Sequence, residues 1–221
     1  MRYSELTEGD RHKFEIAFIN KIKQDCKPYL DEIKNPPAFV LYRGLHDTEG
    51  YGKKTARLTS RTPQDSSAKT HSHINQYFEK KFGHPYRNGV FASGSKVIAS
   101  EYGQGEPYVI FPIGDFEYLW SQHIPDLYVE VAGAGAKAMM HWKKYAEAKG
   151  EKIPLSASRQ EYWKSVNEYR MNHHVWELIE FLGGYQDTEL RKGIFSTHEV
   201  MLWCNEYYYM PKHFLALWDK T

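Results

Sequence analysis

The stretch Phe39-Val40-Leu41-Tyr42-Arg43-Gly44 decides how the rest of this sequence is interpreted. Its aromatic and branched apolar residues predict a short buried strand over residues 38–42. Arg43 ends that strand, and Gly44 lets a ligand approach the backbone closely. An arginine in this place can hold a phosphate or carboxylate through two parallel hydrogen bonds, or it can simply end a strand and pair with a surface acid.

A second informative stretch is Gly89-Val90-Phe91-Ala92-Ser93-Gly94-Ser95. Val90 and Phe91 predict a strand, and the small residues that follow leave room for a ligand ring beside the backbone. Residues 96–102 then predict a short helix, whose Tyr102 can stack on a planar ligand. A serine-rich turn followed by a core tyrosine is the alternative interpretation.

The third stretch is Ser196-Thr197-His198-Glu199-Val200-Met201-Leu202, in which Glu199 opens an apolar strand. A rigid strand fixes the position of such a carboxylate, although a single glutamate at the start of a strand is usually only an edge charge. The functional prediction therefore depends on the ordered set of arginine, serine and glutamate.

In this order the three stretches resemble the ADP-ribosyltransferase family, which cleaves NAD. Phe91-Ala92-Ser93-Gly94-Ser95 is similar to the family's aromatic-x-Ser-Thr-Ser segment, with glycine in place of threonine. The residues from Thr197 to Leu202 are similar to its last motif, where the catalytic acid precedes apolar strand residues. The resemblance covers about residues 38–44, 89–113 and 194–210.

Two branches of that family share features with this chain. Phe91-Ala92 with Ala99 and Tyr102 resembles the His-Tyr-Glu branch, but the first strand carries Arg43 where that branch has histidine. The chain is therefore placed on the Arg-Ser-Glu side. Many arginine-modifying members have Glu or Gln two residues before the catalytic acid, where this chain has Thr197, so arginine as the acceptor is in doubt.

The resemblance implies an α+β fold, an ADP-ribosyltransferase-like split β-sandwich around an NAD cleft, with helical insertions. It implies Glu199 as the acid that stabilises the ribosyl cation, Ser93 as the residue that hydrogen-bonds and orients it, and Arg43 as the group that holds the pyrophosphate or neighbouring ribose. NAD is the expected substrate, and no metal is required. The residues expected to contact NAD are Tyr42, Arg43, Gly44, Phe91, Ala92, Ser93, Ser95 and Tyr102.

The expected activity is transfer of ADP-ribose to a macromolecular acceptor, either protein or nucleic acid. Residues 185–196 correspond to the family's acceptor-recognition region, with Tyr185, Asp187 and Glu189 as candidates. Family members occur as bacterial toxins and as phage proteins, which implies an effector role. Alternatives are an NAD glycohydrolase on the same fold and a non-catalytic partner-binding protein. A nucleic-acid-binding interpretation of Lys53, Lys54, Arg57 and Arg61 also stays open.

Composition sets the outer limits of these predictions. The 221 residues are 41% hydrophobic and carry a formal net charge of +1, so no global field directs the chain to nucleic acid or to an acidic membrane. We expect one domain, with a helical N-terminal segment over residues 1–35 and a helical insertion over about 126–183. Without a signal pattern or a membrane-length apolar run, a cytoplasmic protein is expected, in the host cytoplasm if it comes from a phage or a toxin.

The remaining pattern predicts further elements. Helices are expected over residues 4–34, restarted at Pro28, and over about 66–81, 129–148 and 158–182. A mobile polar loop is expected over 45–65, a short helix or turn over 115–120, and a loop over 185–193. Strands are expected over 107–113, at Ile194-Phe195 and over 205–209. The two cysteines, Cys26 and Cys204, fit a reduced protein, although one disulfide stays possible.

Overall fold

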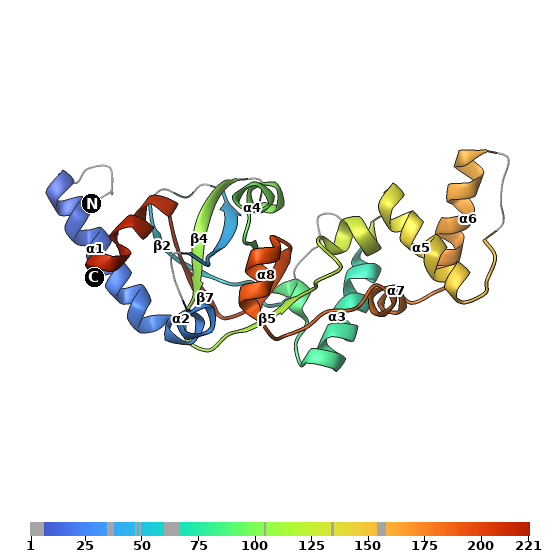
Figure 1. Cartoon of the computed structure of the whole chain (residues 1–221), viewed down its shortest axis with the longest axis horizontal. Coiled ribbons are helices and arrows are strands. Elements are labelled where there is room, and N and C mark those ends of the chain that lie inside the picture. The colour runs from blue at the N-terminus through green and yellow to red at the C-terminus, as the bar shows by residue number, and fades with distance from the viewer. Residues whose placement is uncertain are drawn as a thin grey trace. The chain divides into compact units, whose positions relative to one another are not determined.

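The computed structural model describes residues 7–34, 38–46, 48, 50–59, 67–103, 105–133, 135–153 and 158–221 (Figure 1). The chain forms two compact units. Unit 1 comprises Met1–Thr59, Gly89–Trp120 and Asp187–Thr221, and unit 2 comprises Ser60–Asn88 and Ser121–Gln186. The helical insertion predicted for about 126–183 thus falls within unit 2. Unit 2 also contains Ser60–Asn88, which the sequence did not group with that insertion.

Unit 1 contains a seven-stranded antiparallel sheet and the helices that cover it, which agrees with the predicted α+β class. The strand order is β2-β7-β4-β1-β3-β6-β5. The strands are β1 (Leu41–Leu45), β2 (Gly52–Thr55), β3 (Val90–Ser93), β4 (Glu106–Pro112), β5 (Glu117–Trp120), β6 (Glu199–Trp203) and β7 (Glu206–Met210). The helices are α1 (Glu8–Asp25), α2 (Lys27–Ile33), α4 (Lys96–Gly103), α8 (Leu190–Ser196) and η4 (Lys212–Lys220).

The pairing between neighbouring strands is shortest where β1 meets β3. Tyr42 opposite Ser93 is the one position at which these two strands pair among the described residues. By contrast, β1 pairs with β4 over five positions and β3 pairs with β6 over four. Hydrogen bonds therefore link all seven strands into one sheet, and the joint between its two halves is confined to this single pair.

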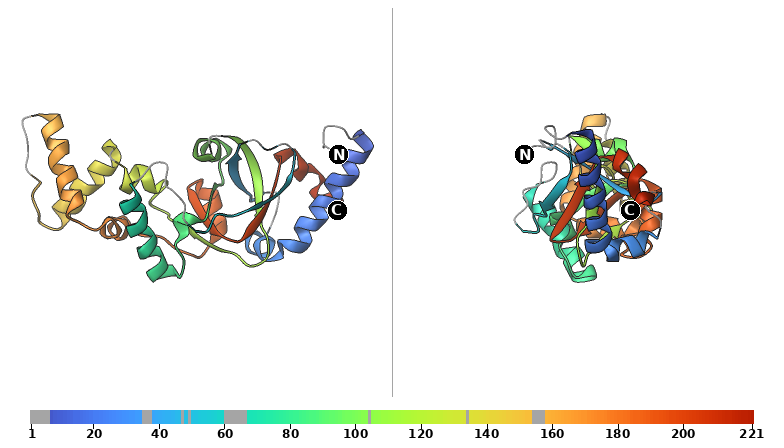
Figure 2. Two further views of the ribbon diagram at one scale, coloured as in Figure 1. Left: turned by 180° about the vertical axis from the view of Figure 1, so that it is seen from behind. Right: turned by 90° about the vertical axis from the view of Figure 1, so that its left-hand side faces the viewer.

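The first and last helices of unit 1 lie side by side (Figure 2). The amino group of Lys23 on α1 donates to the carbonyl oxygens of Trp218 and Thr221, each at 2.8 Å. The sequence correctly predicted the restart at Pro28, which stands in the first turn of α2, where the missing N–H of proline costs nothing.

Four local predictions in unit 1 were wrong. The strand predicted over 38–42, with Arg43 at its end, is β1 over Leu41–Leu45, with Arg43 at its centre. The predicted loop over 45–65 contains β2, an edge strand with alternating exposure whose lysines protect a sheet edge from further pairing. The predicted turn over 115–120 contains β5, because Tyr118 and Leu119 pair with β6. Ile194-Phe195 was predicted as strand but belongs to α8, whose one buried face is too short to produce a clear periodicity.

Unit 2 is helical in the part of the chain that the structure describes. Its elements are α3 (Ala68–Phe82), η2 (Tyr86–Asn88), η3 (Tyr128–Ala132), α5 (Ala136–Ala148), α6 (Arg159–Met171) and α7 (Val175–Phe181). The two long helices predicted for 129–148 and 158–182 are each divided in two. The first break is at Gly133, where an added Cβ would lie 2.7 Å from the Tyr128 carbonyl oxygen, and the second follows Met171.

Candidate active site

Ser93 and Glu199 lie directly opposite each other on the neighbouring strands β3 and β6. Paired residues of antiparallel strands point to the same face, with Cβ atoms about 4.5–5.5 Å apart. Tyr42, which pairs with Ser93 from β1, extends this row across a third strand. Ser93 is fully buried and Glu199 is 5% exposed. Two of the three residues predicted to be catalytic are therefore brought together.

The resemblance implied that the Ser93 hydroxyl hydrogen-bonds Glu199 directly, but this hydroxyl has other partners. It donates to the carbonyl oxygen of Thr197 at 2.6 Å and accepts from the Ser95 N–H at 3.1 Å. Because a hydroxyl has a single proton, this donation leaves none for the carboxylate. Ser93 thus holds the turn that leads into Glu199, and any effect on the carboxylate passes through the main chain.

Thr197 takes a left-handed backbone conformation, with φ of 62°. This conformation is a genuine outlier for a β-branched residue, and such strain tends to be kept at functional positions. Glu189, at the other end of α8, is also left-handed, with φ of 59°. The residues that flank α8 at its two ends therefore both have left-handed backbone conformations.

Gly94 stands where the motif that this segment resembles has threonine, and the packing around it admits no side chain. A Cβ added at Gly94 would lie 1.8 Å from the carbonyl oxygen of Ile194 on α8. A main-chain oxygen cannot move away as a side chain can, so only glycine fits. The turn after β3 therefore packs directly against the helix that precedes the candidate acid.

Arg43 occupies a different place from the one predicted. Side chains alternate along a strand, so its Cβ points to the face opposite Tyr42, Ser93 and Glu199. Its Nη1 donates to the carbonyl oxygen of Phe91 on β3 at 2.6 Å. The guanidinium thus bridges β1 and β3 beside their single backbone pair, which is a structural use of the residue expected to hold phosphate.

The positive charge of Arg43 lowers the pKa of two buried groups and so opposes the effect of burial. Burial raises the pKa of the Cys204 thiol to about 12, and Arg43 opposes that rise. Burial likewise raises the pKa of Tyr207, again against the effect of Arg43. Cys26 and Cys204 are both buried and free, so the disulfide that the sequence left open is not formed.

The other residues predicted to contact NAD differ in exposure. Ala92 is fully buried and Tyr42 is 6% exposed, whereas Phe91 is partly exposed. Gly44 is buried and pairs with Pro107 on β4. The Ser95 hydroxyl accepts the Ile98 N–H at 3.4 Å in the first turn of α4. Tyr102 belongs to α4, but its side chain lies outside the described part of the structure.

The predicted acceptor region contains one exposed aromatic residue that the sequence missed. Asp187 and Glu189 are exposed, as an acceptor contact requires, but Tyr185 is 6% exposed and packs against Phe78 in unit 2. Phe195 on α8 is 80% exposed. The prediction of a strand at Ile194-Phe195 gave no reason to expect this exposure.

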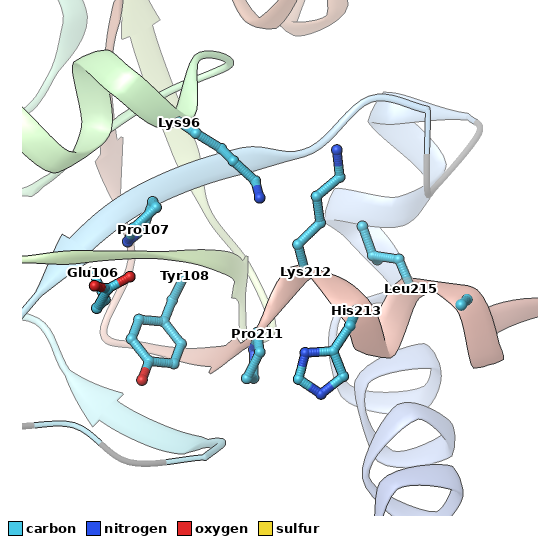
Figure 3. A pocket seen from close by; sticks show the side chains of 9 residues that line it. Lys96, Glu106, Pro107, Tyr108, Pro211, Lys212, His213 and Leu215 are labelled. Atoms are coloured by element: carbon cyan, nitrogen blue, oxygen red, sulfur yellow. The ribbon is translucent and has the colours of Figure 1, made fainter.

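A pocket of about 730 Å³ lies in unit 1, between α4, the start of β4 and η4 (Figure 3). The side chains of Lys96 and Lys212 point into the same space, and Tyr108, Pro211 and His213 lie along its other side. The Lys96 amino group is also 5.7 Å from the centre of the Tyr42 ring, which belongs to the row containing Ser93 and Glu199. The sequence did not predict these lysines as ligand contacts. Lys96 directly follows the serine segment, but Lys212 lies outside all three motifs.

Comparison of the chain with protein-family models, curated proteins and solved structures finds no match. Within the described residues, no group of three or more His, Cys, Asp or Glu side chains is arranged to hold a metal ion. In the same part of the chain, no helix combines the length and the apolar character needed to cross a membrane. The functional interpretation therefore depends on the residues and their geometry.

Proposed function

We propose that unit 1 is a mono-ADP-ribosyltransferase, which cleaves NAD between nicotinamide and ribose and transfers ADP-ribose to a macromolecular acceptor. The observation that carries this proposal is the pairing of the buried Glu199 with Ser93 on adjacent strands. It is supported by the motif resemblance, and the ADP-ribosyltransferase-like split sheet with its NAD cleft is part of the same proposal.

The chemistry requires a fixed carboxylate beside the ribose. As the bond from C1′ to nicotinamide breaks, positive charge develops at C1′, and a carboxylate stabilises such a cation in glycoside cleavage. Nicotinamide leaves as a neutral molecule, so the leaving group needs no proton. The acceptor nucleophile then forms a bond to C1′ and releases its proton to solvent or to a base. In this proposal Glu199 faces C1′ and accepts a hydrogen bond from the ribose 2′-hydroxyl.

The anionic half of NAD is assigned in this proposal to the pocket that contains Lys96 and Lys212. Its volume is in the range usual for small-ligand sites, about 300–1,000 Å³. Two ammonium groups, against the one carboxylate of Glu106, leave positive charge in the pocket for a pyrophosphate. Arg43 then acts by holding β1 against β3, through its bond to Phe91.

The test is turnover of labelled NAD by the parent and by Glu199→Gln, with and without cell lysate. Loss of the carboxylate charge should reduce turnover roughly hundredfold or more, with the fold retained. Glu117→Gln is the matched control, since Glu117 is also the first residue of a strand in the same sheet but is exposed. Equal turnover by the parent and Glu199→Gln would remove the catalytic assignment.

The same experiment separates the alternatives. Label on protein or nucleic acid indicates transfer, and free ADP-ribose alone indicates an NAD glycohydrolase. If the parent protein does not turn over NAD under either condition, the non-catalytic partner-binding interpretation replaces the proposal.

A further inference from the structure

A second pocket, of about 440 Å³, lies within unit 2, and its polar lining consists of basic, amide and hydroxyl side chains. Lys69 and His73 come from α3, Asn167 and Arg170 come from α6, and His174 precedes α7. Of the described residues that line this pocket, none is an acid. A lining of this kind favours an anionic ligand with several hydrogen-bonding groups.

A stack of aromatic rings begins at the edge of this pocket. The His174 ring is 5.9 Å from the Trp176 ring, and their planes differ by 17°. The Trp176 ring is in turn 6.4 Å from that of Tyr77, at an angle of 15°. Trp176 is 39% exposed, so part of the stack faces solvent. Nearly parallel, exposed rings next to basic groups are typical of surfaces on which bases stack.

The basic side chains around the pocket differ in whether they already have an acidic partner. His173 Nε2 lies 3.3 Å from the Glu151 carboxylate, so this side chain already has an acidic partner. Arg170 donates to the carbonyl oxygen of Gly133, a neutral partner. Lys69 is exposed and forms no ion pair with any described residue. Among the described residues, neither Lys69 nor Arg170 therefore has an acidic partner.

We propose that unit 2 binds single-stranded nucleic acid, with phosphates at Lys69 and Arg170 and bases on the stack of His174 and Trp176. An acidic peptide would satisfy the cations, but its carboxylates are not aromatic rings that stack on the His174 and Trp176 rings. A duplex would satisfy the cations but keeps its base faces covered. Single-stranded nucleic acid satisfies both features, and the inference does not depend on NAD chemistry.

The experiment measures binding of the full chain to a short labelled single-stranded oligodeoxythymidylate, without NAD. The parent should bind with an affinity that falls steeply as salt rises, since phosphate contacts release counterions. Lys69→Gln should reduce the slope of log affinity against log salt by about 0.7. Trp176→Ala should weaken binding about tenfold with little change in that slope.

Two controls match these variants in unit 2. Lys80→Gln removes an exposed lysine of the same helix as Lys69, outside the pocket. Phe181→Ala removes an exposed aromatic residue of the same helix as Trp176, outside the stack. Both should bind like the parent if they fold like it.

Three outcomes would overturn the proposal. They are no binding by the folded parent, equal effects of the pocket variants and their controls, and equally tight binding of polyglutamate, which would indicate an acidic protein partner. Because NAD is absent, failure here leaves the NAD turnover test of unit 1 unaffected.

Discussion

Ser93 donates a hydrogen bond of 2.6 Å to the carbonyl oxygen of Thr197, the left-handed residue that ends α8. The bond ties the end of β3 to the turn from which β6 begins, two residues before Glu199. The serine and the glutamate of the motif are therefore connected through backbone and register. Ser93 is thus connected to Glu199 through the main chain, whereas the motif implied a direct hydrogen bond between them.

Replacement of Ser93 by alanine should destabilise unit 1 and impair NAD turnover. Its buried hydroxyl satisfies the Thr197 carbonyl and the Ser95 amide, and loss of a buried partner costs about 1–3 kcal/mol. Chemical denaturation and turnover measure the two effects. Ser100→Ala is the control, because its hydroxyl bonds the Lys96 carbonyl at an exposed position. Unchanged stability and turnover in Ser93→Ala would show that the bond has no such role.

Gly94→Ala should be strongly destabilising. The new Cβ would overlap the Ile194 carbonyl oxygen, and overpacking against a rigid group costs about 3 kcal/mol or more. Gly9→Ala, in the first turn of α1, meets no heavy atom within 4 Å and should raise the free energy of unfolding by about 0.5–1 kcal/mol. Thermal or denaturant unfolding of the two variants tests the difference, and a mild effect at Gly94 would contradict the packing described.

Lys96→Gln and Lys212→Gln should each raise KM for NAD about tenfold, with kcat nearly unchanged. A contact to the pyrophosphate is made equally in the ground state and in the transition state, so its loss weakens binding alone. Lys220→Gln is the control, since this exposed lysine lies on η4 but not in the pocket. If kcat falls while KM stays constant, the pocket does not hold the anionic half of NAD.

Asp25 should stabilise unit 1 in a pH-dependent way. The Tyr208 hydroxyl, 2.6 Å away, and then the Lys21 ammonium lower the pKa of this carboxyl below its ordinary value of 3.8. The contribution is therefore complete above about pH 4 and is lost as pH falls through the lower pKa of the folded state. Asp25→Asn should lower the free energy of unfolding at pH 7, and the difference from the parent should shrink below pH 4.

The control for this pH dependence is Asp31→Asn, at an exposed position of α2. Its difference from the parent should stay small across the same pH range. Denaturant unfolding at several pH values measures both variants, and a difference for Asp25→Asn that grows toward acid pH would contradict the sign given above.

Much of unit 1 was predictable because its signals are local. The strand that Glu199 opens and the helix break or restart near Pro28 each follow from a few adjacent residues. A strand beside Arg43 was also predicted, but it runs over Leu41–Leu45 instead of residues 38–42. The failures at β2, β5 and α8 have a shared cause. These elements are short, so periodicity is weak, and their conformation depends on neighbours that are distant in sequence.

The sequence by itself determined the α+β class and the ordered residues Arg43, Ser93 and Glu199. Only the tertiary structure decided how they are used: register places Ser93 opposite Glu199, while alternation along β1 turns Arg43 to the other face. It also assembled both basic pockets, from segments far apart in the chain. The physical reason is that local conformation depends on neighbouring residues, whereas strand register and pocket composition depend on which distant segments pack together.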